Sequence, residues 1–142
     1  MTQDMREFLA ALARTGARAM VIGGYALAFY GRPRMTKDLD LWVNPKEARQ
    51  LLAAIRDFFG EDLGLTEEDL ATTGVVQLGY APNRIDLVLL DEPDFDAAYA
   101  RSHVYEVGGT PVHVAAKEDL IALKKAFGRP QDRWDIAELE EE

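Results

Sequence analysis

The sequence has no cysteine, which excludes several kinds of site. Without a thiol, the chain can form no disulfide, hold no thiolate-bound zinc and offer no cysteine nucleophile. The sequence also lacks an apolar run long enough to span a bilayer, and its first residues, MTQDMREF, lack the basic-then-apolar pattern of a secretory signal. We therefore expect a cytoplasmic protein.

Basic residues are also few. The 142 residues include 16 Lys and Arg against 25 Asp and Glu, which gives a net charge of −9. This charge argues against a protein that coats nucleic acid broadly, because such proteins need a basic surface. A local basic patch is still possible, since Arg32, Arg34 and Lys37 lie close together in the sequence. The length and a hydrophobic content of 48% predict a single globular domain over residues 1–142.

The most informative stretch is residues 21–43, VIGGYALAFYGRPRMTKDLDLWV. An apolar strand over 19–22 is expected to break at Gly23-Gly24 and to continue into a helical run over 25–30. The basic loop follows, and a second strand is expected over 38–43.

Period-two alternation in that second strand places Asp38, Asp40 and Trp42 on one face and apolar residues on the other. The two aspartates then lie roughly 7 Å apart at the backbone. Side chains spaced in this way can converge on the divalent ions used in phosphoryl and nucleotidyl transfer.

Hydrophobic periodicity, capping residues and turn signals predict the other elements. Helices are expected over about 2–14, 45–60, 93–100, 117–127 and 131–139, with a helical turn near Thr66, and strands over 75–80, 84–90, 103–107 and 110–114. Strands that are interleaved with helices predict an α/β (α+β) fold with a mixed sheet flanked by helices.

Two charged residues occupy positions where apolar residues are expected. Asp86 interrupts an apolar strand, and Lys124 falls within the apolar arc of the helix over 117–127. A buried charge is costly unless it is paired or metal-bound, or reaches the exposed edge of a sheet. A triphosphate or the acid cluster would provide a partner for Lys124; alternatively, this side chain extends to the surface.

The glycine pair after a strand, the Asp-Leu-Asp strand and the later segment Arg84–Val88, with Asp86 at its centre, together resemble the nucleotidyltransferase fold of the DNA polymerase beta superfamily. Within that superfamily, a lysine-bearing helix followed by Arg129, Asp132 and Asp135 resembles the AbiEii- and MenT-type toxin nucleotidyltransferases. The resemblance covers nearly the whole chain.

The resemblance implies an enzyme that transfers a nucleoside monophosphate from an NTP to a hydroxyl and releases pyrophosphate. Asp38, Asp40 and Asp86 would hold Mg²⁺, which prefers carboxylate oxygens. Asp86 would also assist as the base, and Lys124 would belong to the catalytic site. In toxins of this kind the acceptor is commonly the 3′ end of tRNA, and the protein partner would be a cognate antitoxin.

Further residues are candidates for nucleotide binding: Gly23, Gly24, Arg34, Thr36, Lys37 and Arg129. Glycine lets the backbone approach a phosphate, and the start of a helix offers unpaired N–H groups. A simple turn is the alternative for the glycine pair, and a solvated loop is the alternative for Arg34, Thr36 and Lys37. Arg129 could instead form a salt-bridged corner with Asp132 and Asp135.

Two other functions remain open at this point. The first is nucleotidylation of a protein side chain, as in the minimal nucleotidyltransferase antitoxins, which usually carry Gly-Ser in place of Gly23-Gly24. The second is a non-catalytic module that binds a nucleotide or a partner, although the intact acids argue against it. Metal-dependent consumption of NTP separates an enzyme from a module, and labelling of RNA or of protein separates the two enzymes.

Overall fold

A computed structural model describes residues 1–31 and 37–127 of the chain. Its helices are α1 (Gln3–Thr15), α2 (Gly23–Phe29), the 3-10 helix η1 (Pro45–Glu47), α3 (Ala48–Phe59), α4 (Glu67–Leu70), α5 (Phe95–Arg101) and α6 (Lys117–Phe127). Its strands are β1 (Ala19–Ile22), β2 (Leu39–Val43), β3 (Gly74–Leu78), β4 (Ile85–Leu89), β5 (His103–Val107) and β6 (Thr110–Val114). The predicted elements are confirmed to within one or two residues at each end, whereas the helix expected over 131–139 lies outside the described residues.

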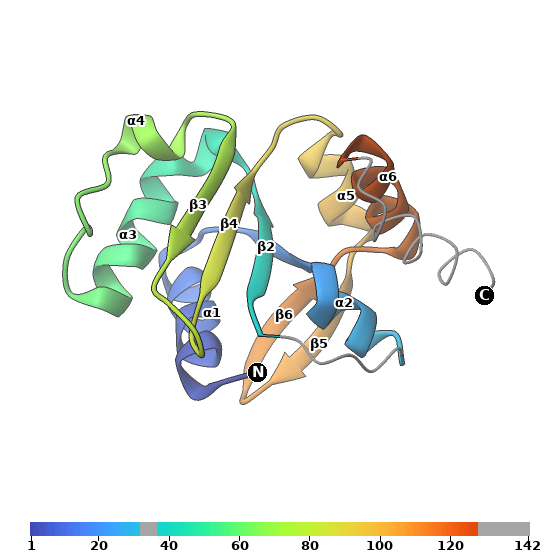
Figure 1. The fold of residues 1–142 in the computed structure, drawn as a ribbon, viewed down its shortest axis with the longest axis horizontal. Helices are drawn as coiled ribbons and strands as arrows, with labels where there is room; N and C mark the ends of the chain where they lie inside the picture. The colour runs from blue at the N-terminus through green and yellow to red at the C-terminus, as the bar shows by residue number, and fades with distance from the viewer. Residues whose placement is uncertain (32–36, 128–142) are drawn as a thin grey trace.

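All the strands of the described ranges belong to one six-stranded sheet with the order β3-β4-β2-β1-β6-β5 (Figure 1). The sheet is mixed, as the sequence predicts. β1 pairs antiparallel with β2 and parallel with β6, and β2 pairs parallel with β4. The expected antiparallel pairs β3–β4 and β5–β6 form the two ends of the sheet.

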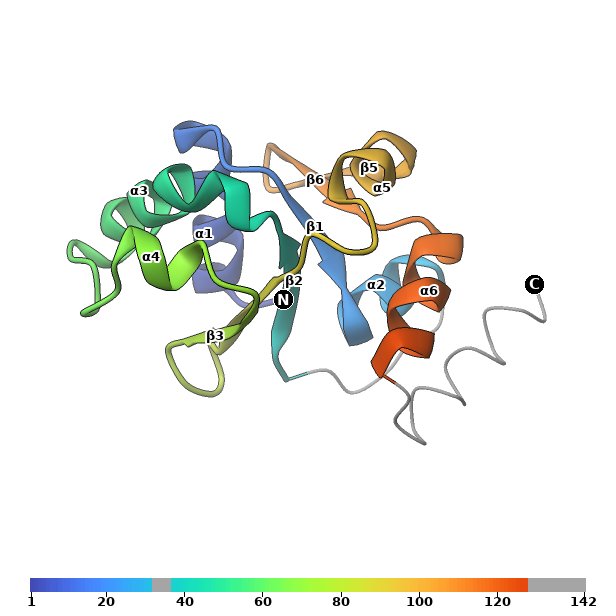
Figure 2. The same ribbon diagram turned by 90° about the horizontal axis from the view of Figure 1, so that it is seen from above.

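Helices cover both faces of the sheet. Figure 2 shows α1 and α3 on one side and α2 and α6 on the other. The helix ends follow from local sequence: Thr2 caps the start of α1, and Gly16 and Gly60 end α1 and α3 in the left-handed conformation. In the described part of the chain, no helix has both the length and the apolar character needed to cross a bilayer.

The strand face that carries Asp38, Asp40 and Trp42 is polar only at the start of β2. Trp42 is fully buried, although it shares a face with Asp40. Its ring packs edge-to-face on Phe95 of α5 at 5.6 Å, and its Nε1 donates a hydrogen bond to the Leu90 carbonyl at 3.0 Å. Helix α5 therefore covers one end of this face, and the acids lie at the other end.

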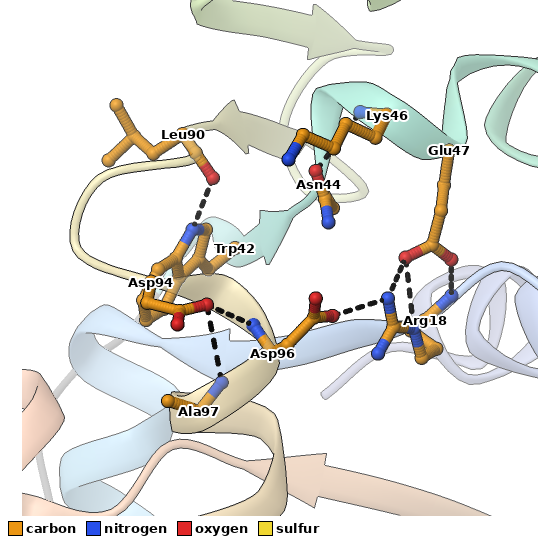
Figure 3. A network of polar contacts seen from close by, with 9 residues as sticks. All are labelled: Arg18, Trp42, Asn44, Lys46, Glu47, Leu90, Asp94, Asp96 and Ala97. Carbon is orange, nitrogen blue, oxygen red and sulfur yellow. Dashed lines mark hydrogen bonds and ion pairs between the residues drawn. The ribbon is translucent and has the colours of Figure 1, made fainter.

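A network of polar contacts links the elements at the end of the sheet that lies far from the acids (Figure 3). Arg18, just before β1, contacts Glu47 at 2.7 Å and Asp96 of α5 at 2.8 Å. Its guanidinium also lies over the rings of Phe95 and Tyr99. This cluster connects the start of β1 with η1 and α5. It stabilises the end of the sheet that lies opposite Asp38, Asp40 and Asp86, and it involves none of these three acids.

Candidate active site

The sheet register brings two of the predicted acids together. Asp40 of β2 lies directly opposite Asp86 of the neighbouring parallel strand β4, so the two side chains share one face of the sheet. Asp38 precedes β2 by one residue and belongs to the same face by alternation. Asp86 is buried, whereas Asp38 and Asp40 are half-buried. We call the surface that carries Asp38, Asp40 and Asp86 the acid face.

Gly23 lies directly against one of these acids. It has a φ of +69°, and a Cβ added there would lie 2.5 Å from Oδ2 of Asp40. Any other residue would therefore be strained in its backbone and would collide with the carboxylate. The sequence suggests that Gly23 allows a phosphate to approach, and the structure adds the approach of Asp40 as a second reason for glycine. Gly24 is half-buried in the first turn of α2.

The surroundings of Asp40 disfavour its charged form. Burial, and after it the negative charges of Asp86 and Asp38, raise the pKa of Asp40 to about 6, whereas Lys124 and Arg84 act in the opposite direction. A carboxyl group with a raised pKa is stabilised in its charged form by an added cation. The electrostatics of the acid face therefore favour binding of a cation.

The arginine that precedes β4 already contacts two of the acids. Arg84 donates from Nε to Oδ1 and from Nη2 to Oδ2 of Asp86, both at 3.1 Å. Its Nε also lies 3.7 Å from Oδ2 of Asp38. The sequence did not indicate Arg84 as a site residue. The available signal was its position two residues before Asp86, which places both side chains on one face of the strand.

A pocket of about 270 Å³ opens beside Asp40. Its lining combines Asp40, Gly23 and Lys124 with apolar side chains from the sheet and from α6: Ile22, Val75, Val88, Leu120 and Leu123. Lys124 is half-buried and lines this pocket together with Asp40, and its catalytic role stays a prediction. Val75 of the edge strand β3 is 61% exposed, which leaves the pocket accessible from that side.

The chemistry of the acid face fits a metal site made of three carboxylates. In the structure, however, the three side chains do not converge on one point. Carboxylates on adjacent strands offer the hard oxygen atoms that Mg²⁺ prefers, and the raised pKa of Asp40 favours a cation. Within residues 1–31 and 37–127, however, no group of three or more His, Cys, Asp or Glu side chains lies close enough to hold an ion. The metal ligands Asp38, Asp40 and Asp86 therefore stay predictions.

Several predicted nucleotide-binding residues lie outside the described residues. These are Arg34, Thr36 and Arg129, together with the neighbouring Arg32, Asp132 and Asp135. Lys37 is described and exposed, directly before Asp38. Tyr25 of α2 is a nearby residue that the sequence did not indicate: burial and then the charge of Asp38 raise the pKa of its hydroxyl.

A comparison with protein families gives one match that spans nearly the whole chain. The family described as "Nucleotidyl transferase AbiEii toxin, Type IV TA system" matches residues 7–140. Among curated proteins, no sequence matches this chain.

Solved structures share the fold at low sequence identity. A protein from Thermotoga maritima that is provisionally described as a nucleotidyltransferase is 15% identical, with a TM-score of 0.60 and coverage of 96% of this chain and 91% of that one. ANT(2″)-Ia in complex with adenylyl-2″-tobramycin is 20% identical, with a TM-score of 0.56 and coverage of 99% and 85%. An antigenic nucleotidyltransferase-like protein from Paracoccidioides brasiliensis is 18% identical, with a TM-score of 0.59 and coverage of 95% and 72%.

Proposed function

The chain belongs to the AbiEii nucleotidyl transferase toxin family, and we propose that it transfers a nucleoside monophosphate from an NTP to the 3′ end of a tRNA. The observation that carries the proposal is the pairing of Asp40 with Asp86, where Asp40 lines a pocket together with Gly23 and Lys124. The proposed setting is the cytoplasm, where NTPs and tRNA are found together, and the proposed protein partner is a cognate antitoxin.

In the proposed reaction, the acceptor hydroxyl oxygen attacks the α-phosphorus of the NTP. A new P–O bond forms to the acceptor, the bond from the α-phosphorus to the bridging oxygen breaks, and pyrophosphate leaves with that electron pair. The hydroxyl proton goes to a carboxylate of the acid face, for which we propose Asp86. Both oxygens of Asp86 accept a hydrogen bond from Arg84, and each oxygen keeps a second lone pair for a proton.

We propose that Asp38, Asp40 and Asp86 hold Mg²⁺. The chemistry that Mg²⁺ supplies when bound is charge neutralisation at the phosphates and at the acids. Gly23 allows Asp40 to approach the start of α2, and the half-buried Lys124 offers a positive charge to a phosphate on the pocket side. The side chains of Lys37, Arg32 and Arg34, which lie close together in the sequence, would bind acceptor phosphates.

The test is a labelling experiment. Wild-type protein and Asp40→Asn are each incubated with one α-labelled NTP, Mg²⁺, total tRNA and cell lysate. We expect label on tRNA with the wild type and none with Asp40→Asn. Because Asn has the shape of Asp, loss of labelling without loss of the thermal unfolding transition would assign the effect to chemistry. Asp57→Asn, which removes an acid from an exposed ion pair elsewhere, should label normally.

The same experiment distinguishes the alternatives. Label on a lysate protein would identify a protein nucleotidyltransferase and overturn the tRNA acceptor. NTP binding without any labelling would indicate a binding module. Induced expression should also arrest growth in a host that lacks the antitoxin, and Asp40→Asn should abolish the arrest if toxicity requires transfer.

A further inference from the structure

Arg84 is held by its backbone at the junction of the two acid-bearing strands. Its carbonyl accepts a hydrogen bond from the Leu39 amide at 3.0 Å, where β2 begins beside β4. From this anchored backbone the side chain extends to the acid face. It engages both oxygens of Asp86 and approaches Asp38, so one cation bridges two of the proposed metal ligands.

The guanidinium and a divalent ion compete for the same oxygen atoms. A bidentate arginine uses both carboxylate oxygens of its partner, and two cations within a few Å repel each other. The exposures indicate which group can move. The Arg84 side chain is 38% exposed and that of Asp86 only 12%, so the arginine can swing towards solvent while the acid stays in place.

We propose that Arg84 is a resident counter-cation of the acid face, which a divalent ion displaces from Asp86 and Asp38 and which then binds the phosphates of the NTP. Guanidinium is suited to both positions, because its planar array of N–H donors matches carboxylate and phosphate alike. The anchored backbone keeps the displaced side chain within reach of the site. The inference rests on the proposed function, since it assumes that the acid face takes a metal and an NTP.

The first test measures metal binding without nucleotide, so it does not depend on turnover. Mn²⁺ is titrated into the protein, and free Mn²⁺ is followed by electron paramagnetic resonance. We expect Arg84→Gln to bind Mn²⁺ about 10-fold more tightly than the wild type, because a repelling charge has been removed. Arg14→Gln is the matched control: it removes the same charge from a surface pair with Asp57 and should leave Mn²⁺ affinity unchanged.

The second test measures nucleotide binding at saturating Mn²⁺, with a non-hydrolysable α,β-methylene NTP and calorimetry. We expect Arg84→Gln to bind the analogue about 10-fold more weakly, because a charge-assisted contact to phosphate is lost. Arg84→Lys keeps the charge without the planar array and should fall between the two. It also provides a second variant if Arg84→Gln fails to fold.

The outcomes separate this inference from the proposed function. Tighter Mn²⁺ binding together with weaker analogue binding supports the inference. Unchanged Mn²⁺ affinity in Arg84→Gln, with Mn²⁺ bound by the wild type and lost in Asp40→Asn, would overturn it and leave the metal site intact; Arg84 would then only stabilise the fold. Absence of Mn²⁺ binding in the wild type and in Arg84→Gln alike would overturn the metal site and the inference with it.

Discussion

At the residue scale, burial and then the neighbouring negative charges make the ionised form of Asp40 unfavourable. Asp40 is half-buried beside Asp86 and Asp38, and its pKa is raised to about 6. A carboxyl whose pKa is higher in the folded state than in the unfolded state opposes folding once it ionises. The stability associated with its protonated form is therefore complete below about pH 4 and is lost as the pH rises through about 6.

Asp40→Asn should remove this pH dependence. At pH 8 in the absence of divalent ions, we expect the variant to be more stable than the wild type by at most about 3 kcal/mol, with the difference vanishing towards pH 4. Urea denaturation at several pH values between 4 and 8 measures this difference. Parallel stability curves for the two proteins would show that Asp40 ionises as freely in the folded chain as in the unfolded chain.

Gly23→Ala tests whether position 23 must be glycine because Asp40 lies against it. The new methyl group would meet Oδ2 of Asp40, and the backbone would keep a φ near +69°. We expect a loss of about 1–2 kcal/mol in stability from the backbone and at least about 10-fold in activity from displacement of Asp40. Gly16→Ala is the control: Gly16 has a φ of +76° with nothing within 4 Å of the added Cβ.

The two glycine variants should therefore differ in activity but not greatly in stability. Chemical denaturation and the labelling assay together test this expectation. Equal activity losses in both variants would mean that backbone strain, rather than the contact with Asp40, explains the effect at Gly23.

At the scale of elements, an ion pair between the exposed Arg101 of α5 and the buried Asp119 of α6 helps to position α6 beside the pocket. Arg101 of α5 donates from Nη2 and Nε to the two oxygens of Asp119, which is 5% exposed. The Tyr30 hydroxyl also donates to the Ala115 carbonyl just before α6, at 2.7 Å. Lys124 lies five residues after Asp119 on the same helix, so we expect these contacts to position it beside the acids.

Asp119→Asn should loosen α6. We expect a loss of about 1–3 kcal/mol in stability, faster hydrogen exchange in α6 and a raised KM for NTP, with a smaller effect on kcat. Asp57→Asn, which breaks an exposed pair, should cost about 0–1 kcal/mol and leave both kinetic constants unchanged. An unchanged KM in Asp119→Asn would show that the ion pair only stabilises the fold.

At the scale of the whole molecule, one sheet with helices on both faces should unfold as a single unit. A core that runs from α1 and α3 through the sheet to α5 and α6 offers no obvious internal boundary among the described residues. Calorimetry should give one transition with an enthalpy of roughly 100 kcal/mol near 60 °C. Two resolved transitions would contradict the expectation of a single domain over residues 1–142.

The elements could be read from the sequence because each depends on local chemistry. The apolar periodicity of α3, the hairpin glycines between β5 and β6 and the capping residue Thr2 act over a few residues, and the structure confirms the elements they predict. The face shared by Asp38 and Asp40 follows from the period of a strand in the same way. The position of Lys124 on an apolar arc could also be read from the sequence, but whether it meets the acids, a phosphate or solvent could not.

The contacts between elements were decided only by the tertiary structure. Strand order and register are set by how the whole core packs, so the pairing of Asp40 with Asp86 could be expected only through the family resemblance. The engagement of Asp86 by Arg84 depends on a side-chain conformation that alternation permits but does not require. Burial of Trp42 beneath α5 likewise needed a helix that lies distant in the sequence. The sequence by itself determined which residues could perform chemistry. The packing of elements that are distant in the sequence decided which of these residues lie in contact, because burial of the whole core sets the arrangement of the elements.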